Sequence, residues 1–361
     1  MGPTPTRVET QALRTAAQSF QTSSQALHDR AVPAIGRTGL PSFSVPAMSM
    51  GYGHNYDDAR SAMDLTCKLG ANVLSTISLA LTRVANHYEG QDGENAKMFG
   101  GNPIPPPALP GKADLSSDAG WLDDTIASLM AIGEGGAVSA MIAVALAGLG
   151  TSSARAGGAA IIAPFGVFCL ANLRDPVPHF LAASGWNEVE GVLADLFPEL
   201  QKQVHDVTAT AKWQGDGANS FNDYVTNIFA PMIDSARSLA GDMKTSSYEA
   251  GGGLSTALLL FIIATYTAIT TCLEANADPT GLAGTAIIWA TLSMWATFIL
   301  EIIGEMIATF AMLGIASATI ASGYKSLAGW LKDSDGSLDG KSANLSVDDT
   351  TTIQDWNQWT E

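Results

Sequence analysis

Two carboxylates have the spacing that most resembles a chemical site. Glu301 and Glu305 lie four residues apart in an apolar stretch, so a helix would place both on one face. A carboxylate pair can act in acid–base catalysis, but no nucleophile, metal-ligand set or substrate-binding motif accompanies this one. We therefore expect no catalytic residues and no enzyme. Two interpretations remain open: the pair lies inside a membrane, at a pore or a polar helix contact, or it marks the interface where a membrane span ends.

Cysteine and histidine give no sign of a metal or redox site. Cys67, Cys169 and Cys272 are far apart without a CxxC pair, and the histidines form no HxxxH pair. This spacing favours cysteines that act as small buried apolar residues. The chain also lacks the glycine-rich, HExxH and GxSxG motifs of common enzymes. We expect neither a metal nor a cofactor.

The charge balance excludes one class of partner. The chain has 18 basic and 35 acidic residues, a formal net charge of −17, so it repels phosphate backbones and we expect no nucleic acid. Only 15% of the residues are charged while 47% are hydrophobic. An average soluble domain has about 25% charged residues, so long apolar stretches dilute the charge. The first residues have no basic region followed by an apolar one, so we expect no Sec signal peptide.

A W-x-G motif stands between two amphipathic stretches. Trp213-Gln214-Gly215 follows the apolar stripe of residues 186–212 and precedes a second stripe through Phe221 and Tyr224. Glycine permits a tight reversal, and the tryptophan ring can fill the space between the helix ends. The pattern predicts a helical hairpin over residues 184–250.

A second hairpin is predicted in residues 1–97. Residues 8–30 form one amphipathic stripe, and a second stripe begins near Asp57 and ends near Tyr88. The segment between them, 32–56, is rich in proline and glycine and is predicted to be a long loop. Tyr88 and Asp92 form a YxxxD motif at the end of this hairpin.

These motifs carry a family resemblance. Residues 186–246 resemble a WXG100 protein, one of the small hairpins exported by type VII (ESX) systems, and residues 8–97 resemble the related ESX secretion-associated hairpins. The first hairpin departs from the pattern, because its turn has no tryptophan. The resemblance implies that Tyr88 and Asp92 are an export signal read by the secretion ATPase. It also implies pairing with a WXG100-like partner or self-association through the hairpins. It covers about 150 residues and does not reach residues 254–325.

Several other segments are strongly apolar. Residues 254–273 and 282–300 contain no charge, and the first run is long enough to cross a bilayer. A straight helix over 282–322 would be about 60 Å long, so it must break near Gly304 or leave the membrane there. The Ala/Gly-rich region 120–183 predicts closely packed helices, with a membrane location possible. The apolar hairpin could instead be the buried core of a soluble bundle.

The sequence therefore predicts an all-α fold of elongated helical hairpins or a bundle, with a hydrophobic hairpin that is a candidate transmembrane hairpin. The expected divisions are two hairpins at 1–97 and 184–250, a Pro/Gly-rich linker at 98–119, apolar regions at 120–183 and 251–330, and an acidic disordered tail at 331–361.

The expected function is that of a type VII-related secretion substrate with membrane-inserting helices, secreted or bound to a lipid bilayer. The alternatives are a resident membrane scaffold carrying WXG100-like modules, or a pore-forming effector.

Overall fold

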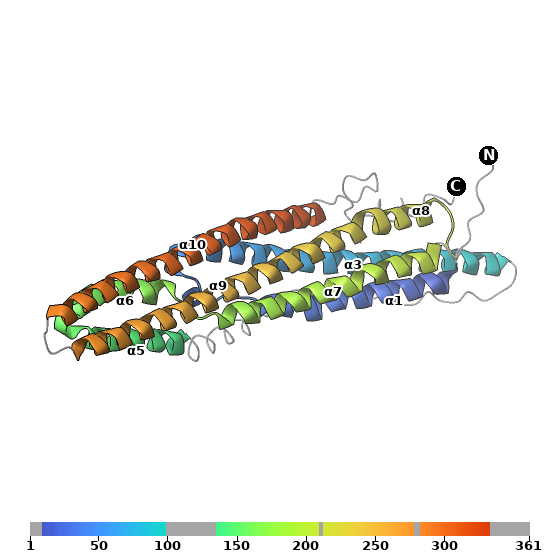
Figure 1. The fold of residues 1–361 in the computed structure, drawn as a ribbon. Helices are drawn as coiled ribbons and strands as arrows, with labels where there is room; N and C mark the ends of the chain where they lie inside the picture. The colour runs from blue at the N-terminus through green and yellow to red at the C-terminus, as the bar shows by residue number, and fades with distance from the viewer. Residues whose placement is uncertain (1–8, 99–134, 209–211, 278–281, 333–361) are drawn as a thin grey trace.

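The computed structural model describes residues 9–98, 135–208, 212–277 and 282–332, and within these ranges all regular structure is helical. The predicted all-α fold is confirmed. Figure 1 shows an elongated rod, in which α1 (Thr10–Ala26) begins near one end, and the end of α9 and the start of α10 lie at the other. The predicted linker and acidic tail lie outside the described residues, apart from Met98, Leu331 and Lys332.

The first hairpin forms, but its loop is shorter than predicted. After α1 the chain continues through a π-helical turn, Leu27–Ala31, and α2, Val32–Gly36; two 3-10 turns, Ser42–Ser44 and Ala47–Ser49, then lead into α3, Met50–Met98. The predicted loop over 32–56 was therefore wrong at both ends. Pro33 lies at the start of α2, directly after the π-helical turn. Tyr52 and Tyr56 are buried, and their burial outweighs the helix cost of the nearby glycines.

The second hairpin also forms, and it merges with the first apolar helix. It consists of α7, Val177–Thr208, then α8, Asp216–Asp223, a π-helical turn, Tyr224–Phe229, and α9, Ala230–Asn276. The boundary predicted between residues 250 and 251 falls inside α9. The helix continues through the glycines there because they permit close packing. A β-carbon at Gly251 would lie only 3.0 Å from the ring of Phe180 in α7.

The remaining helices are α5, Gly135–Ser152, α6, Gly158–Asn172, and α10, Leu282–Lys332. The alternative that α10 breaks near Gly304 was wrong, because the helix runs unbroken through that position. With 51 residues it is about 75 Å long.

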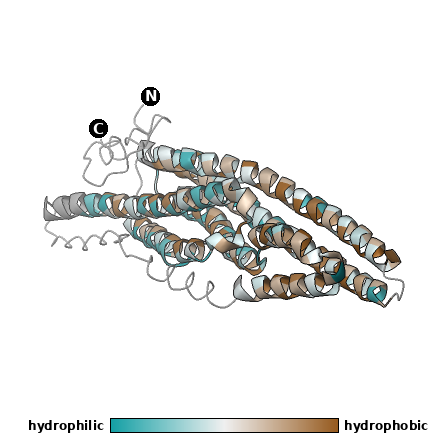
Figure 2. Cartoon of the chain, turned by 90° about the vertical axis from the view of Figure 1, so that its left-hand side faces the viewer, coloured by the Kyte–Doolittle hydropathy of each residue, from teal (hydrophilic) through white to brown (hydrophobic). Residues whose placement is uncertain are grey.

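The helices pack differently in the two parts of the rod. In one part, α3 lies between α1 and α10, and α9 lies between α10 and α7. In the other, α5 packs on α9 and α6, and α6 also touches α10. We call this second part, residues 135–172, 254–276 and 282–305, the apolar half. Figure 2 shows that brown, hydrophobic residues predominate toward one end of the rod.

Candidate functional site: an apolar four-helix end

Side-chain contacts align the four helices of the apolar half, α5, α6, α9 and α10, along the length of the rod. Near the tip, the Asn276 amide donates to the Ser152 carbonyl oxygen at 2.6 Å, and Arg155 donates to the Asn276 carbonyl oxygen at 3.5 Å. Halfway along, the Trp295 ring lies 5.8 Å from that of Phe165, and its indole N–H donates to the Thr265 hydroxyl at 3.1 Å. These contacts tie α5 and α6 to α9 and α10 at matching heights.

Large apolar side chains point outward all around this half. On α9, Ile263 is 52% exposed and Tyr266 68%; on α10, Met294 is 73% exposed. The set continues over all four helices with Met141, Val144, Val167, Leu259, Leu273, Leu282, Ile287, Trp289, Phe298 and Leu300. Single exposed apolar residues are normal in soluble proteins, but a continuous apolar surface marks a protein or membrane contact.

Among the described residues, four helical segments are long and apolar enough to cross a membrane by length and composition. They are Ala47–Glu89 in α3, Gly158–Thr208 in α6 and α7, Gly217–Asn276 in α8 and α9, and Leu282–Gly329 in α10. The segments differ in how much of their most apolar window is buried inside the protein. The most apolar window of the first is 72% buried, so the core of the protein explains its composition. The windows in α9 and α10 are only 33% and 39% buried. Their apolar residues are therefore not accounted for by a soluble core, and this favours the membrane account.

The length of the apolar half matches a bilayer. The 18 residues of α5 span about 27 Å, close to the hydrocarbon thickness of about 30 Å. Because α6 and α10 run in the same direction from the tip, the Phe165–Trp295 contact places the end of α6, at Asn172, level with Ile302. Glu301 and Glu305, both exposed, thus lie at the base of this half. Their position favours the interface interpretation over one deep inside a membrane.

An open groove of about 900 Å³ runs between α9 and α10 in this half. Its walls are mainly apolar, with Leu260, Met294 and Phe298 among them, and Glu301 closes it toward the base. Threonine and serine hydroxyls lie along both walls. No group of residues suited to hold a metal ion occurs in the described ranges of the chain.

The W-x-G motif occupies the turn of the second hairpin, as the spacing predicts. Trp213 is 1% exposed, and its ring lies 5.5 Å from Phe221, which in turn meets Phe20 of α1 at 5.9 Å. The main-chain N–H of Trp213 donates to Val207 at the end of α7, at 3.0 Å. The tryptophan therefore fills the junction of three helices. Gly215 adopts φ +119° and ψ −178° just before α8.

We expect Gly215→Ala to destabilise the protein by about 1–3 kcal/mol, because that backbone region is open almost only to glycine. Urea unfolding followed by circular dichroism measures the change. Gly191→Ala is the matched control, since Gly191 lies in helix α7 with no neighbour within 4 Å of its added β-carbon. Equal stability of the two variants would show that the turn does not require glycine.

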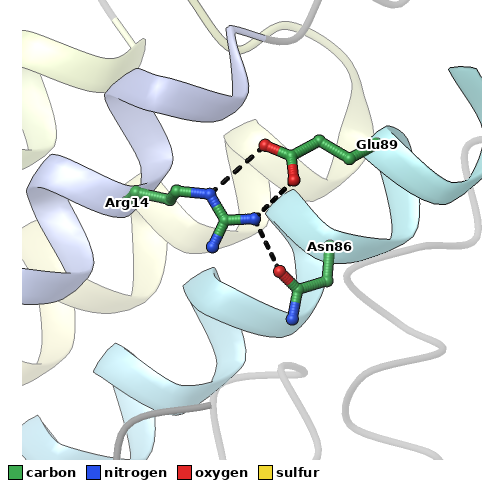
Figure 3. Close-up of polar contacts among 3 residues, drawn as sticks. All are labelled: Arg14, Asn86 and Glu89. Atoms are coloured by element: carbon green, nitrogen blue, oxygen red, sulfur yellow. Dashed lines mark hydrogen bonds and ion pairs between the residues drawn. The ribbon is translucent and has the colours of Figure 1, made fainter. Parts of the chain in front are cut away.

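Tyr88 and Asp92 lie in α3 itself, because the helix continues to Met98 rather than ending before the motif. Their spacing of one turn places them on the same side of that helix. Tyr88 is partly buried, and burial raises the pKa of its hydroxyl. Beside it, Arg14 of α1 donates to both carboxylate oxygens of Glu89, at 3.2 and 2.6 Å, and to Asn86 at 2.6 Å (Figure 3).

The start of α1 connects the two motifs. The main-chain N–H of Glu9 donates to the Lys212 carbonyl oxygen at 2.6 Å, next to Trp213, while Arg14 holds Glu89, next to Tyr88. Both motifs therefore lie near the same end of the rod. Arg14 was not singled out from the sequence, because its partner is 75 residues away and no local pattern relates them.

The fold and site define the class: an elongated all-α protein with helices able to cross a membrane. Comparison with protein-family models, curated proteins and solved structures found no match.

Proposed function

We propose that this protein is a type VII (ESX)-related secreted helical protein whose apolar half inserts into a lipid bilayer. One observation carries the membrane part of the proposal: α9 and α10 present an apolar surface, over about one bilayer thickness, that the rest of the described chain leaves uncovered. A soluble bundle would bury this surface to gain about 25 cal/mol for each Å² removed from water.

The secretion part of the proposal rests on the hairpins. A W-x-G turn with a buried tryptophan joins α7 to α8, and a YxxxD motif lies near the same end of the rod. These are the features by which the sequence resembles the WXG100 family. The partners that follow from the resemblance are a type VII secretion ATPase and a WXG100-like protein or a second copy of this chain.

Liposome flotation of the purified full-length protein tests membrane insertion. We expect the protein to float with the vesicles and to resist extraction by high salt, because apolar contact is insensitive to charge screening. Protein that stays at the bottom of the gradient under all conditions would contradict the membrane part of the proposal.

A resident membrane scaffold with WXG100-like hairpins is the second candidate, favoured by the unbroken connection between the second hairpin and the apolar half in α9. Fractionation of cells with and without the secretion ATPase separates the two. A secreted protein is expected in the culture medium only when the ATPase is present. A resident protein is expected in the membrane pellet of both strains.

We expect Tyr88→Ala and Asp92→Ala to keep the protein inside the cell. The reason is that a motif read by an ATPase acts through its own side chains. Because Tyr88 is partly buried and packs against the core, its truncation also lowers stability, and folding has to be checked separately. The measurement is the extracellular amount of each variant, with circular dichroism to verify folding. Asp58→Ala, an acidic position elsewhere on α3, is the control and should be secreted normally. Normal secretion of the Tyr88/Asp92 double variant would remove the motif from the proposal.

A further inference from the structure

A short loop makes hydrogen bonds on both sides of the link between α6 and α7, where the α5–α6 hairpin joins the remainder of the protein. Residues 41–49, which we call the clasp, contain the two 3-10 turns between α2 and α3. The Met48 main-chain N–H donates to the side-chain oxygen of Asn172, the last residue of α6, at 3.1 Å. The Ser44 carbonyl oxygen lies 3.1 Å from Nε2 of His179, in the first turn of α7. The clasp therefore fastens both sides of the α6–α7 link.

His179 is fully buried, and its hydrogen bonding defines its protonation. It is 0% exposed, with its ring 6.0 Å from that of Tyr52 and 5.8 Å from that of Phe310. A carbonyl oxygen can only accept, so Nε2 carries the hydrogen and Nδ1 holds a lone pair. Nδ1 is buried, and no described residue lies within hydrogen-bonding distance of it. A proton added at Nδ1 would thus be a buried charge without an acceptor.

The elements around His179 offer little to compensate that charge. From α3 it faces the ring of Tyr52, and the clasp contains no titratable residue. On α10 no ionisable residue lies between Glu305 and Tyr324. On α9, Tyr248 and Glu249 are exposed.

In the link before α7 are Arg174 and Asp175. The Asp175 carboxylate already accepts the Val177 main-chain N–H, at 3.0 Å. Burial accordingly lowers the pKa of His179 from 6.5 to about 4.

We propose that His179 and the clasp form an acid-sensitive latch, whose opening frees the α5–α6 hairpin from α9 and α10 and promotes insertion into a bilayer. Opening would expose the inner apolar faces of both helix pairs, including Ile142 and Trp295, which are buried in the closed rod. This inference names a regulation of the apolar half and rests on the proposed membrane function.

The direction of the pH dependence follows from the neutral state of the buried ring. Above pH 6.5 the ring is neutral in both closed and open forms, and the latch has its full stability. As the pH falls from 6.5 to about 4, only the open form takes up the proton. The equilibrium between the forms shifts about tenfold toward open for each pH unit in this window.

Two measurements on the full-length protein test the latch. Hydrogen exchange without lipid, at about pH 7 and about pH 4.5, should show lost protection in the clasp and the first turn of α7 after correction for intrinsic exchange rates. Flotation with uncharged phosphatidylcholine vesicles should increase over the same range, because such vesicles minimise the contribution of acidic surface residues.

The variants assign the effect to one side chain. His179→Gln keeps an N–H that can donate to Ser44 but takes up no proton, so both acid responses should be lost. His205→Gln alters an exposed histidine on α7 and should respond like the wild type. If the glutamine variant does not fold at neutral pH, His179→Met, which fills the space with a flexible apolar side chain, replaces it.

The possible outcomes separate the latch from the membrane proposal. An unchanged acid response in the His179 variant, or no change in clasp protection in the wild type, overturns the latch. Equal flotation of wild type at both pH values also overturns it while leaving membrane insertion in place. No flotation at either pH overturns the membrane proposal.

Discussion

Replacing Trp213 by alanine is expected to lower the free energy of unfolding by about 3–5 kcal/mol, the usual cost of removing a large buried aromatic side chain. The ring is 1% exposed and packs on Phe221, which contacts Phe20 of α1. Its removal would leave a cavity where α1, α7 and α8 meet. Because α1, α7 and α8 also contact one another around this site, the site can collapse only partly.

Urea and thermal unfolding, followed by circular dichroism, measure this loss. Trp289→Ala is the matched control, because Trp289 is 48% exposed on α10 and its truncation should change stability by about 0.5 kcal/mol or less in water. If Trp213→Ala unfolds at the same urea concentration as the wild type, the tryptophan does not support the hairpin turn, and a role in partner binding would be the remaining one.

Ile263→Asp is expected to reduce insertion into vesicles roughly a hundredfold, because a charged aspartate near the centre of a span costs about 2.5–3.5 kcal/mol. The same change should leave the protein folded in water. Ile263 is 52% exposed and lines the open groove between α9 and α10, so the carboxylate would remain hydrated. If the helix were only a buried core element, the variant would unfold instead.

Phe261→Asp gives the contrasting result. Phe261 lies two residues earlier on the same helix but is 1% exposed, so a carboxylate there would be buried without a partner and should unfold the apolar half even in water. Flotation and circular dichroism of the two variants test both statements. An Ile263→Asp protein that floats as well as the wild type would place residues 254–276 outside the bilayer.

The helical hairpins were predictable because their signals are local. Apolar residues recur every three to four positions in α1, α3, α7 and α9, and the W-x-G turn combines a glycine with a ring large enough to fill the junction. The continuous packing of α9 was not predictable. Gly251 to Gly253 indicate a helix end when read alone, and only the closeness of Phe180 explains why the helix continues.

The site was predictable in part. The absence of charge over 254–273 and 282–300 identified the apolar pair, but which faces stay exposed depends on where α5 and α6 pack. His179 gave no signal, because a lone histidine in a helix has the same pattern whether it is buried or exposed. Its environment is built from the clasp, α3 and α10, which are distant in the sequence.

The unbroken length of α9 and α10 has a mechanical consequence. α9 runs from the second hairpin to the apolar tip over 47 residues, and α10 runs from the tip back along α3 over 51 residues. Neither contains an internal proline beyond the first turn of α9. A continuous helix without a kink transmits a rotation along its length. Each residue turns the helix by about 100°, so one residue inserted in it would turn everything beyond the insertion by that angle. A partner that rotates α9 at the hairpin end would therefore also rotate the outward-facing side chains of the apolar half, some 60 Å away.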